Sequence, residues 1–469
     1  METTKHNYNF GYLMLLSVIA ALGGFLFGYD EAVISGTISD VSAQFGLTAL
    51  AEGWFVGSAL LGAIIGVAFA GAIGDRFGRK PAMTVSAVLF SISMIGCALC
   101  GSFPSLVAYR IIGGMGIGVA SIICPLYISE IAVPERRGLL VSLYQLAITI
   151  GIVAAYLVNS RLLAFSDSGA ELQGIFGKIF ISECWRGMLG MGIVPSLIFL
   201  VAVALIPESP RWLVTRGAVN KAGSIFSRIF TNKSDISAQI AATKEVSGNK
   251  EKSEISTLFK PGIFKAVIIG VCIAILGQFM GVNAVLYYGP EIFKDAGLSS
   301  GDALFSQVLV GVANMATTVV AMFIIDKVGR KNLIYYGVSG MILSLLLIAF
   351  YFSFGETMGI STIFLLVAFM LYIICCAGSI CAVVWVILSE MYPIKVRGLA
   401  MSVAGFALWI GTFLIGQLTP VLLSEITPTG TFLLFAAMCV PYMLIMWKCV
   451  PETTGKSLEE IEKYWTKKQ

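Results

Sequence analysis

Two ionisable residues, Asp30 and Arg110, lie within or at the edge of long apolar runs of the sequence. Charged side chains inside a membrane are rare because burying a charge in hydrocarbon is costly, so each marks a candidate functional site. A carboxyl group there can take up and release a proton, and its proton affinity changes with its distance from a guanidinium group. The pair predicts a proton-binding site that responds to conformation, and a permanently buried ion pair is the alternative.

Uncharged polar and aromatic side chains occur in other apolar runs. An amide both donates and accepts hydrogen bonds, which suits a ligand rich in hydroxyl groups, and a Trp ring offers a flat apolar face. These candidates for binding a solute are Gln145, Gln278, Asn283, Asn314, Trp385 and Trp409. Taken singly, each amide could instead join two membrane helices, and each Trp could anchor a helix end at the membrane surface.

The sequence offers little for metal or redox chemistry. It has ten cysteines and one histidine, His6. Cys97 and Cys100 are spaced as C-x-x-C but lie in an apolar run, so we interpret them as packing residues. The glycine-rich run 113–118 is also apolar, which favours close helix packing over a dinucleotide site. We therefore expect no metal, no cofactor, no nucleic-acid partner and no enzymatic activity.

The elements that must hold these residues are apolar runs separated by short polar links. Hydrophobic residues make up 57% of the 469-residue chain, charged residues make up 12%, and the mean hydropathy is +0.89. About 20 apolar residues cross a bilayer as a helix, whose backbone groups bond within the segment. The sequence therefore predicts an all-α integral membrane protein with 12 transmembrane helices. The centres of the runs lie near Leu22, Leu61, Leu89, Ile117, Thr149, Ile193, Ile275, Val312, Met341, Phe369, Trp409 and Ala437.

The basic residues favour one side of the membrane. Of the 31 Lys and Arg residues, Arg110 falls in or beside a predicted helix, and few fall in the links of the opposite side. Those few are Arg161, Lys178, Arg186 and Lys294. Because an excess of Lys and Arg marks cytoplasmic links, both termini are predicted to be cytoplasmic.

Three motifs occur twice in the same order, once in each part of the chain. D-R-F-G-R-K at 75–80 recurs as D-K-V-G-R-K at 326–331, Ser129-Glu130 recurs as Ser389-Glu390, and P-E at 207–208 recurs at 451–452. This repeat predicts two related six-helix halves, with a site between them. The predicted boundaries are residues 1–206 and 262–450 for the halves, 207–261 for a cytoplasmic linker with short helices, and 451–469 for a cytoplasmic tail.

The repeated motifs place acidic and basic residues at helix ends on the predicted cytoplasmic side. Opposite charges there can lock helices together in one conformation and separate in another, although a single exposed pair contributes only about 0 to 1 kcal/mol. We interpret the set as a cytoplasmic gate, and solvated topology signals are the alternative. Its members are Asp75, Arg79, Glu130, Arg137, Glu208, Arg211, Asp326, Arg330, Glu390, Arg397 and Glu452.

As a set, the motifs D-R-F-G-R-K, P-E-R-R-G, P-E-S-P-R-W, Q-F-M-G-V-N-A-V-L-Y-Y and P-E-T-T-G-K-S-L-E-E-I resemble the sugar porter family of the major facilitator superfamily. The resemblance covers essentially the whole chain. It implies the major facilitator superfamily fold, with two six-helix bundles, in a plasma membrane, and a bacterial inner membrane in particular. Gly28-Tyr29-Asp30 is similar to the proton-coupled xylose and hexose symporters, whereas the facilitative glucose transporters carry Asn at the third position.

The resemblance also implies that the amides and Trp residues named above line the sugar site, with Phe27 and Tyr287 nearby. Gly277, Leu408 and Gly192 depart from the family, since relatives carry a glutamine, an amide and an acidic residue at these positions. Losing a buried hydrogen bond commonly costs about 1 to 3 kcal/mol. We therefore do not expect xylose or glucose specificity to carry over, and a polyol, inositol, another pentose or a deoxy sugar stays open.

The leading expectation is proton-coupled uptake of a monosaccharide or related polyol by alternating access. Asp30 would take a proton from outside, its pairing with Arg110 would loosen, and the loaded carrier would turn inward. A facilitative uniporter without proton coupling is the alternative, and a membrane sugar sensor is a more distant one. The expected partners are the solute, protons and the lipid bilayer, and the chain is expected to be a monomer. Glu31 is expected to lie nearer to solvent than Asp30 and to matter less.

Overall fold

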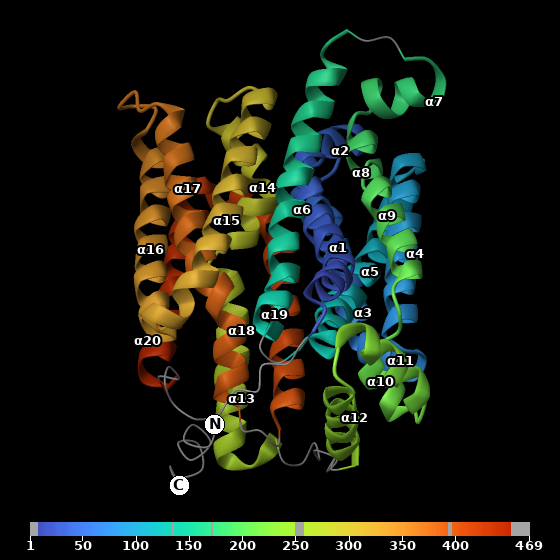
Figure 1. Cartoon of the computed structure of the whole chain (residues 1–469). Helices are drawn as coiled ribbons and strands as arrows, with labels where there is room; N and C mark the ends of the chain where they lie inside the picture. The colour runs from blue at the N-terminus through green and yellow to red at the C-terminus, as the bar shows by residue number, and fades with distance from the viewer. Residues whose placement is uncertain (1–7, 134–135, 170–171, 249–257, 393–395, 452–469) are drawn as a thin grey trace.

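The computed structural model describes residues 8–133, 136–169, 172–248, 258–392 and 396–451. Within these residues it contains 12 helical segments long and apolar enough to span a membrane, and every predicted run centre falls within one of them. The prediction of an all-α membrane protein with 12 spans in two six-helix bundles is confirmed (Figure 1).

The helices follow the chain in three groups. The first half contains α1 (Phe10–Val33), the 3-10 turn η1 (Ile34–Gly36), α2 (Ile38–Phe45), α3 (Ala49–Phe77), α4 (Arg79–Leu99), α5 (Phe103–Ile131), α6 (Arg137–Ser166), α7 (Gly174–Gly177), the π-helical turn η3 (Lys178–Ser182), α8 (Trp185–Gly190) and α9 (Ile193–Leu205). Between the halves lie α10 (Pro210–Thr215), α11 (Val219–Ile229) and α12 (Lys233–Gly248). The second half contains α13 (Pro261–Phe279), α14 (Val282–Asp295), α15 (Ser300–Val328), α16 (Arg330–Phe354), α17 (Thr362–Gly378), α18 (Ile380–Met391), α19 (Arg397–Glu425) and α20 (Thr427–Lys448).

Three spans each consist of two helices with a break between them: α8 and α9, α13 and α14, and α17 and α18. The break before α14 falls at Gly281, whose φ of 92° glycine adopts without steric cost. The break before α18 falls at Ser379, with φ −124° and ψ −83°. Non-helical backbone at membrane depth is tolerated where protein buries it or where it lines a cavity. Both breaks therefore point to the interior of the second half.

The glycine-rich run 113–118 lies in α5, which packs closely on α3. A Cβ atom at Gly114 would lie 1.9 Å from the carbonyl oxygen of Ala59, and one at Gly118 would lie 2.3 Å from that of Ala63. Only residues without a side chain permit this backbone approach, so the run is a helix-packing motif, as expected. The contact fixes the position of α5 and of Arg110 on it.

The two halves meet along α3 with α19 and along α6 with α15. We term the end of the bundle that carries α10–α12 the linker face, and the opposite end, where α2 lies, the far face (Figure 1). At the far face, α14 of the second half packs on η1 and α2 of the first half.

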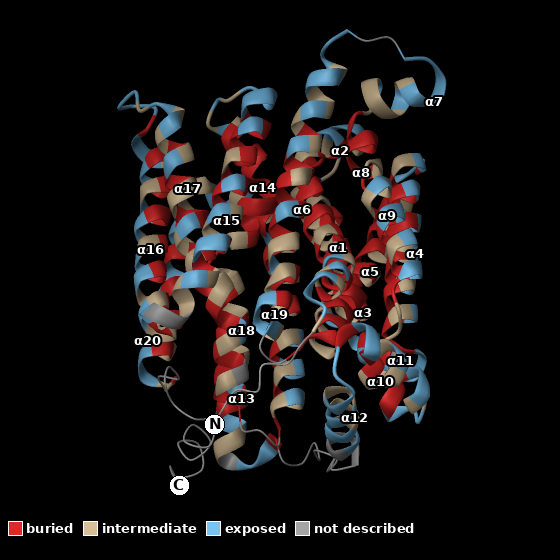
Figure 2. Ribbon diagram, viewed as in Figure 1, coloured by how far each residue is buried: buried red, intermediate tan, exposed pale blue. Residues whose placement is uncertain are grey.

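Buried residues follow the sides of helices that face one another, whereas exposed residues cover the outward sides (Figure 2). Many exposed side chains are large and apolar, among them Val201, Phe323 and Ile363. Soluble proteins rarely expose large apolar patches, and a membrane supplies the apolar surroundings that these side chains need. The outward surface is therefore suited to contact with lipid.

Candidate proton and solute site

Asp30 on α1 and Arg110 on α5 form a buried ion pair. Arg110 Nη1 donates hydrogen bonds to Asp30 Oδ1 at 3.1 Å and to Oδ2 at 3.2 Å, and both side chains are 3% exposed. Both residues lie inside membrane spans. Removing one charge from a buried pair leaves the other uncompensated, which is strongly unfavourable. Protonation of Asp30 would therefore remove the charge that holds Arg110 in place.

Glycines make room for this pair. At Gly28, two residues before Asp30, an added Cβ would lie 1.9 Å from the carbonyl oxygen of Ile148, so α1 and α6 touch through their backbones. On α5, a Cβ at Gly113 would lie 2.4 Å from Ser93 Oγ and 3.9 Å from Asp30 Oδ1. The close packing that these glycines permit brings the carboxyl and guanidinium groups within hydrogen-bond distance.

Glu31 is more exposed than Asp30, as expected, but it makes a specific contact. Its Oε1 accepts a hydrogen bond of 2.8 Å from the hydroxyl of Tyr287 on α14, in the other half. Asp30, Glu31, Arg110 and Tyr287 line one small cavity. The expectation that Glu31 matters less stays a prediction, and its place in the same apolar run as Asp30 is the sequence signal that points to it.

Four of the predicted solute-binding residues lie near the contact of α13, α19 and α1. Asn283 Nδ2 donates to Gln278 Oε1 at 2.8 Å across the α13–α14 break. Gln278 packs on α19 at Gly411, where an added Cβ would lie 3.2 Å from its side chain. Trp409 of α19 is buried and packs on Phe27 of α1, with 5.6 Å between ring centroids. Amide groups and an aromatic pair therefore lie where the halves approach each other.

The other predicted solute contacts are more dispersed. Trp385 of α18 is 42% exposed, and its ring lies 3.5 Å from the position of a Cβ atom at Gly405. Gln145 of α6 is exposed, whereas Asn314 of α15 is buried. The Tyr287 hydroxyl donates a hydrogen bond to Glu31. Binding of solute by these residues stays a prediction.

Several hydrogen bonds join the two halves toward the far face. The Tyr156 hydroxyl on α6 donates to the carbonyl oxygen of Leu286 at 2.8 Å and accepts from Gln307 Nε2 at 3.0 Å. Lys294 Nζ donates to Ser39 Oγ at 2.6 Å. Together with the Tyr287–Glu31 bond, these contacts close the far face.

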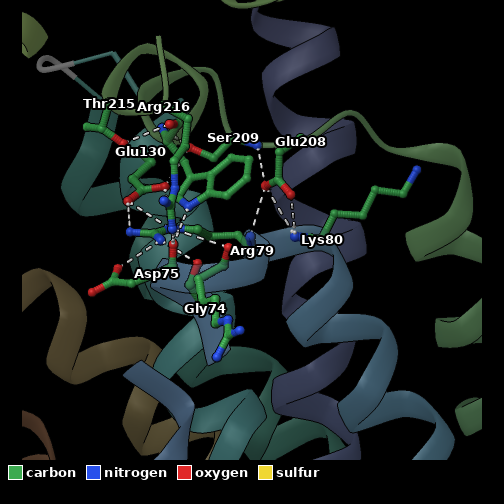
Figure 3. A network of polar contacts seen from close by, with 11 residues as sticks. Gly74, Asp75, Arg79, Lys80, Glu130, Glu208, Ser209, Thr215 and Arg216 are labelled. Atoms are coloured by element: carbon green, nitrogen blue, oxygen red, sulfur yellow. Dashed lines mark hydrogen bonds and ion pairs between the residues drawn. The ribbon is translucent and has the colours of Figure 1, made fainter. Parts of the chain in front are cut away.

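At the linker face of the first half, Arg79 is the centre of a polar network (Figure 3). Its guanidinium donates to Glu130, with 2.8 Å between Nη2 and Oε1, and to Asp75 Oδ1 at 3.0 Å. Glu208 accepts from the backbone N–H groups of Arg79 at 3.0 Å and Lys80 at 3.2 Å. A carboxylate in this position satisfies free N–H groups at the start of α4 and interacts favourably with the helix dipole. The network ties α3, α4, α5 and the segment before α10 together.

Arg137 and Arg211, two more predicted gate residues, have buried Nε atoms without a hydrogen-bond partner. Burial lowers the pKa of Arg211, and the positive charge of Arg137 lowers it further, against the opposing charge of Glu130. These two arginines thus lie close enough to repel each other, with Glu130 partly compensating.

The second half has a related network at the linker face. Arg330 Nη2 pairs with Glu390 Oε1 at 3.2 Å, as Arg79 pairs with Glu130 in the first half. Arg397 donates to the carbonyl oxygen of Tyr392. The side chains of Asp326 and Glu452 lie outside the described residues. In the described part of this face, the ion pairs between predicted gate residues join helices of the same half.

Comparison with known proteins identifies the family. The family model described as "Sugar (and other) transporter" matches residues 16–465. The chain belongs to this family. It is 39% identical to the arabinose-proton symporter of Bacillus subtilis over 462 residues, which are 98% of this chain and 97% of that protein. It is 36% identical to the D-xylose-proton symporter of Escherichia coli over 490 residues, with 98% and 96% covered. The resemblance to sugar porters is thus confirmed, as is the expectation of a transporter instead of an enzyme.

The fold is similar to solved structures of the E. coli xylose transporter XylE. The TM-score is 0.84 for its inward-open conformation, at 33% identity, covering 97% of this chain and 100% of that one. It is 0.79 for the proton:xylose symporter XylE bound to 6-bromo-6-deoxy-D-glucose, at 35% identity, covering 98% and 100%. The major facilitator superfamily fold is therefore confirmed.

Proposed function

We propose that this protein carries a monosaccharide or related polyol into the cell together with a proton, by alternating access. The observation that carries the proposal is the buried Asp30–Arg110 ion pair inside two membrane spans. A proton on Asp30 neutralises the carboxylate and loosens its hold on Arg110, so proton binding is linked to the arrangement of α1 and α5. A proton that crosses the membrane supplies about 2.3 kcal/mol per 100 mV.

The proposed solute site lies between the halves, at the amides and aromatic rings of α13, α14, α19 and α1. Gln278 and Asn283 offer donors and acceptors to sugar hydroxyls, and Trp409 and Phe27 offer apolar faces. Further proposed contacts come from Gln145, Tyr287, Asn314 and Trp385. Relatives named as arabinose and xylose symporters support a sugar-sized solute. Gly277 and Leu408 offer no side-chain hydrogen bond, which favours a solute that needs fewer hydrogen bonds than xylose.

We place the linker face in the cytoplasm of a bacterial cell, with both termini on that side of the inner membrane. The concentration of Lys and Arg in the linker-face links and the bacterial origin of the relatives support this orientation. On this orientation the closed far face is the outer one, and the carrier is inward-facing. The linker-face pairs Arg79–Glu130 and Arg330–Glu390 would then hold each half rigid as it moves. One chain contains both halves, so a monomer suffices.

The proposal is tested by uptake of radiolabelled L-arabinose, D-xylose, D-glucose and myo-inositol into proteoliposomes. Wild type with an inward proton gradient is expected to accumulate one of these solutes above equilibrium. Asp30→Asn is expected to lose accumulation while it still exchanges solute across the membrane. If wild type only equilibrates the solute and the variant behaves alike, the protein is a uniporter and proton coupling at Asp30 is wrong.

A further inference from the structure

Glu31 is the second carboxyl group inside the first membrane span, and it touches the other half of the protein. It follows Asp30 on α1, and its Oε1 accepts the 2.8 Å hydrogen bond from Tyr287 of α14. Tyr287 is 1% exposed and Glu31 is partly buried, so the bond is partly shielded from water. The proton transfer proposed at Asp30 does not use the contact.

Among the described hydrogen bonds that join the halves, the Tyr287–Glu31 bond has the only carboxyl acceptor. The others end on a backbone carbonyl or a hydroxyl, as at Leu286, Ser39 and Leu50. A hydrogen bond to an ionised group is about twice as strong as a neutral one. The strength of this bond therefore depends on whether Glu31 carries a proton, whereas the carbonyl and hydroxyl acceptors stay neutral.

The surroundings of Glu31 contain one cation in the described part of the chain. Arg110 lines the same cavity, and it is already paired with Asp30. The other titratable groups that face Glu31 are neutral hydroxyls and a thiol. They belong to Tyr287 on α14, Tyr144 and Tyr156 on α6, and Cys381 on α18. With both carboxyls ionised, the site holds one negative charge more than it holds positive charge, which a buried site disfavours. One proton on either carboxyl removes this excess, so Glu31 can bind a proton while Asp30 stays paired with Arg110.

We propose that Glu31 is a proton-sensitive latch of the far face. The ionised carboxylate holds Tyr287 across the two halves and keeps the far face closed, and a proton on Glu31 weakens this hold. Acid on the far side therefore favours opening, which gives Asp30 and the solute site access to that side. The role in transport rests on the proposed symport, whereas the latch itself is a property of the closed far face.

The latch can be measured by hydrogen–deuterium exchange of the full chain in lipid nanodiscs without solute. Backbone exchange over residues 282–295 is compared at pH 5.5 and pH 7.5 after correction for the intrinsic pH dependence of amide exchange. Wild type is expected to exchange about tenfold more slowly at the higher pH. Tyr287→Phe and Glu31→Ala should abolish this protection, and Glu31→Gln, which keeps an acceptor but no charge, should exchange alike at both pH values.

Tyr288→Phe is the matched control. The Tyr288 hydroxyl donates to the carbonyl oxygen of Gly416 at 2.6 Å within the second half, so this variant loses a phenol hydrogen bond without touching Glu31. It should keep the wild-type pH dependence. The double variant Glu31→Ala/Tyr287→Phe should exchange no faster than either single variant, because both act on one bond.

Wild-type pH dependence in Glu31→Gln and Tyr287→Phe, or additive effects in the double variant, would overturn the latch. The exchange measurement needs neither solute nor a proton gradient, so it separates the two proposals. A wild type that shows the latch but does not accumulate solute with a proton gradient would overturn the symport and leave the latch standing.

Discussion

The two halves carry different chemistry at matching points of the internal repeat. Gly28-Tyr29-Asp30 in the first half aligns with Gly281-Val282-Asn283 in the second. Asp30 is ionisable, lies on the continuous helix α1 and pairs with Arg110 of its own half. Asn283 is neutral, follows a helix break and bonds to Gln278 of its own half. The difference supports the proposal that proton binding belongs to the first half and that polar contact with solute belongs mainly to the second.

The largest effect, on solute uptake, is expected when the carboxyl group of the first half is removed or moved to the second half. Asp30→Asn should reduce uptake in proteoliposomes from accumulation to equilibration. The swap Asp30→Asn/Asn283→Asp should not restore accumulation, because Arg110 lies against α1 and a carboxylate at 283 would replace the amide that bonds to Gln278. Recovery of gradient-driven accumulation in the swap would show that the two halves are interchangeable. It would contradict the assignment of proton binding to the first half.

The next largest effect, on stability, is expected at a glycine that both halves have at the start of a helix. Gly78 and Gly329 precede α4 and α16 with φ of 107° and 89°, conformations that are strained for other residues. At Gly78 an added Cβ would also lie 2.2 Å from Glu208 Oε2. Alanine at either position is expected to lower the free energy of unfolding by about 1 to 3 kcal/mol, measured by thermal unfolding in detergent.

Gly71→Ala is the control for these glycine variants. Gly71 lies inside α3, and an added Cβ there meets nothing within 4 Å. Alanine also has the higher helix propensity, so this variant should be at least as stable as wild type. A loss at Gly71 equal to that at Gly78 would mean that any added methyl group destabilises this region, independent of backbone conformation.

The fold could be predicted from hydropathy because each span is an apolar run of sufficient length. The breaks at Gly281 and Ser379 could not, because apolar residues continue on both sides and hydropathy does not report backbone angles. The glycine-rich run of α5 was interpretable since its residues had no plausible partner except another helix backbone. Length and polarity thus define the spans, while the packing of neighbouring helices determines where they bend.

The pairing of Asp30 with Arg110 was predictable because few charged residues lie within the spans, so each has few available partners. The Tyr287–Glu31 bond was not, because it depends on how α1 and α14 rotate against each other across the two halves. The repeated motifs indicated which charges gather at helix ends. They did not show that Arg79 and Arg330 each pair with a glutamate of their own half.

A smaller effect, on KM, should distinguish the amide of Gln278 in the second half from that of Gln145 in the first. Gln278→Ala removes an amide proposed to bond to the solute, together with the acceptor of Asn283. It is expected to raise KM for the transported sugar about tenfold, since a lost hydrogen bond costs about 1 to 3 kcal/mol. Gln145→Ala in the first half should raise KM less, because Gln145 is exposed and leaves no amide partner unsatisfied. Initial-rate uptake measures both. A larger change at Gln145 would place polar recognition in the first half.

The smallest effect is expected at the far face of the first half, where Glu183 bonds to Arg186 and accepts from Gln44 at 2.8 Å. Burial acts to raise the pKa of Glu183, but hydrogen bonds from Gln44 and Arg186 and the charge of Arg186 outweigh it and lower the pKa. A lowered pKa in the folded state means that the ionised form stabilises the protein above the unfolded-state value. This contribution is lost as the pH falls through the lowered pKa.

Glu183→Gln should therefore reduce the free energy of unfolding at neutral pH by about 1 kcal/mol or less, as for a partly exposed ion pair. The difference from wild type should shrink as the pH falls below 4.5, the ordinary pKa of Glu, because the unfolded chain takes up a proton there before the folded protein does. Thermal unfolding between pH 3.5 and pH 7 measures it, and the exposed Glu356→Gln serves as control. A constant difference across this range would mean that the effect of the substitution does not come from the charge of Glu183.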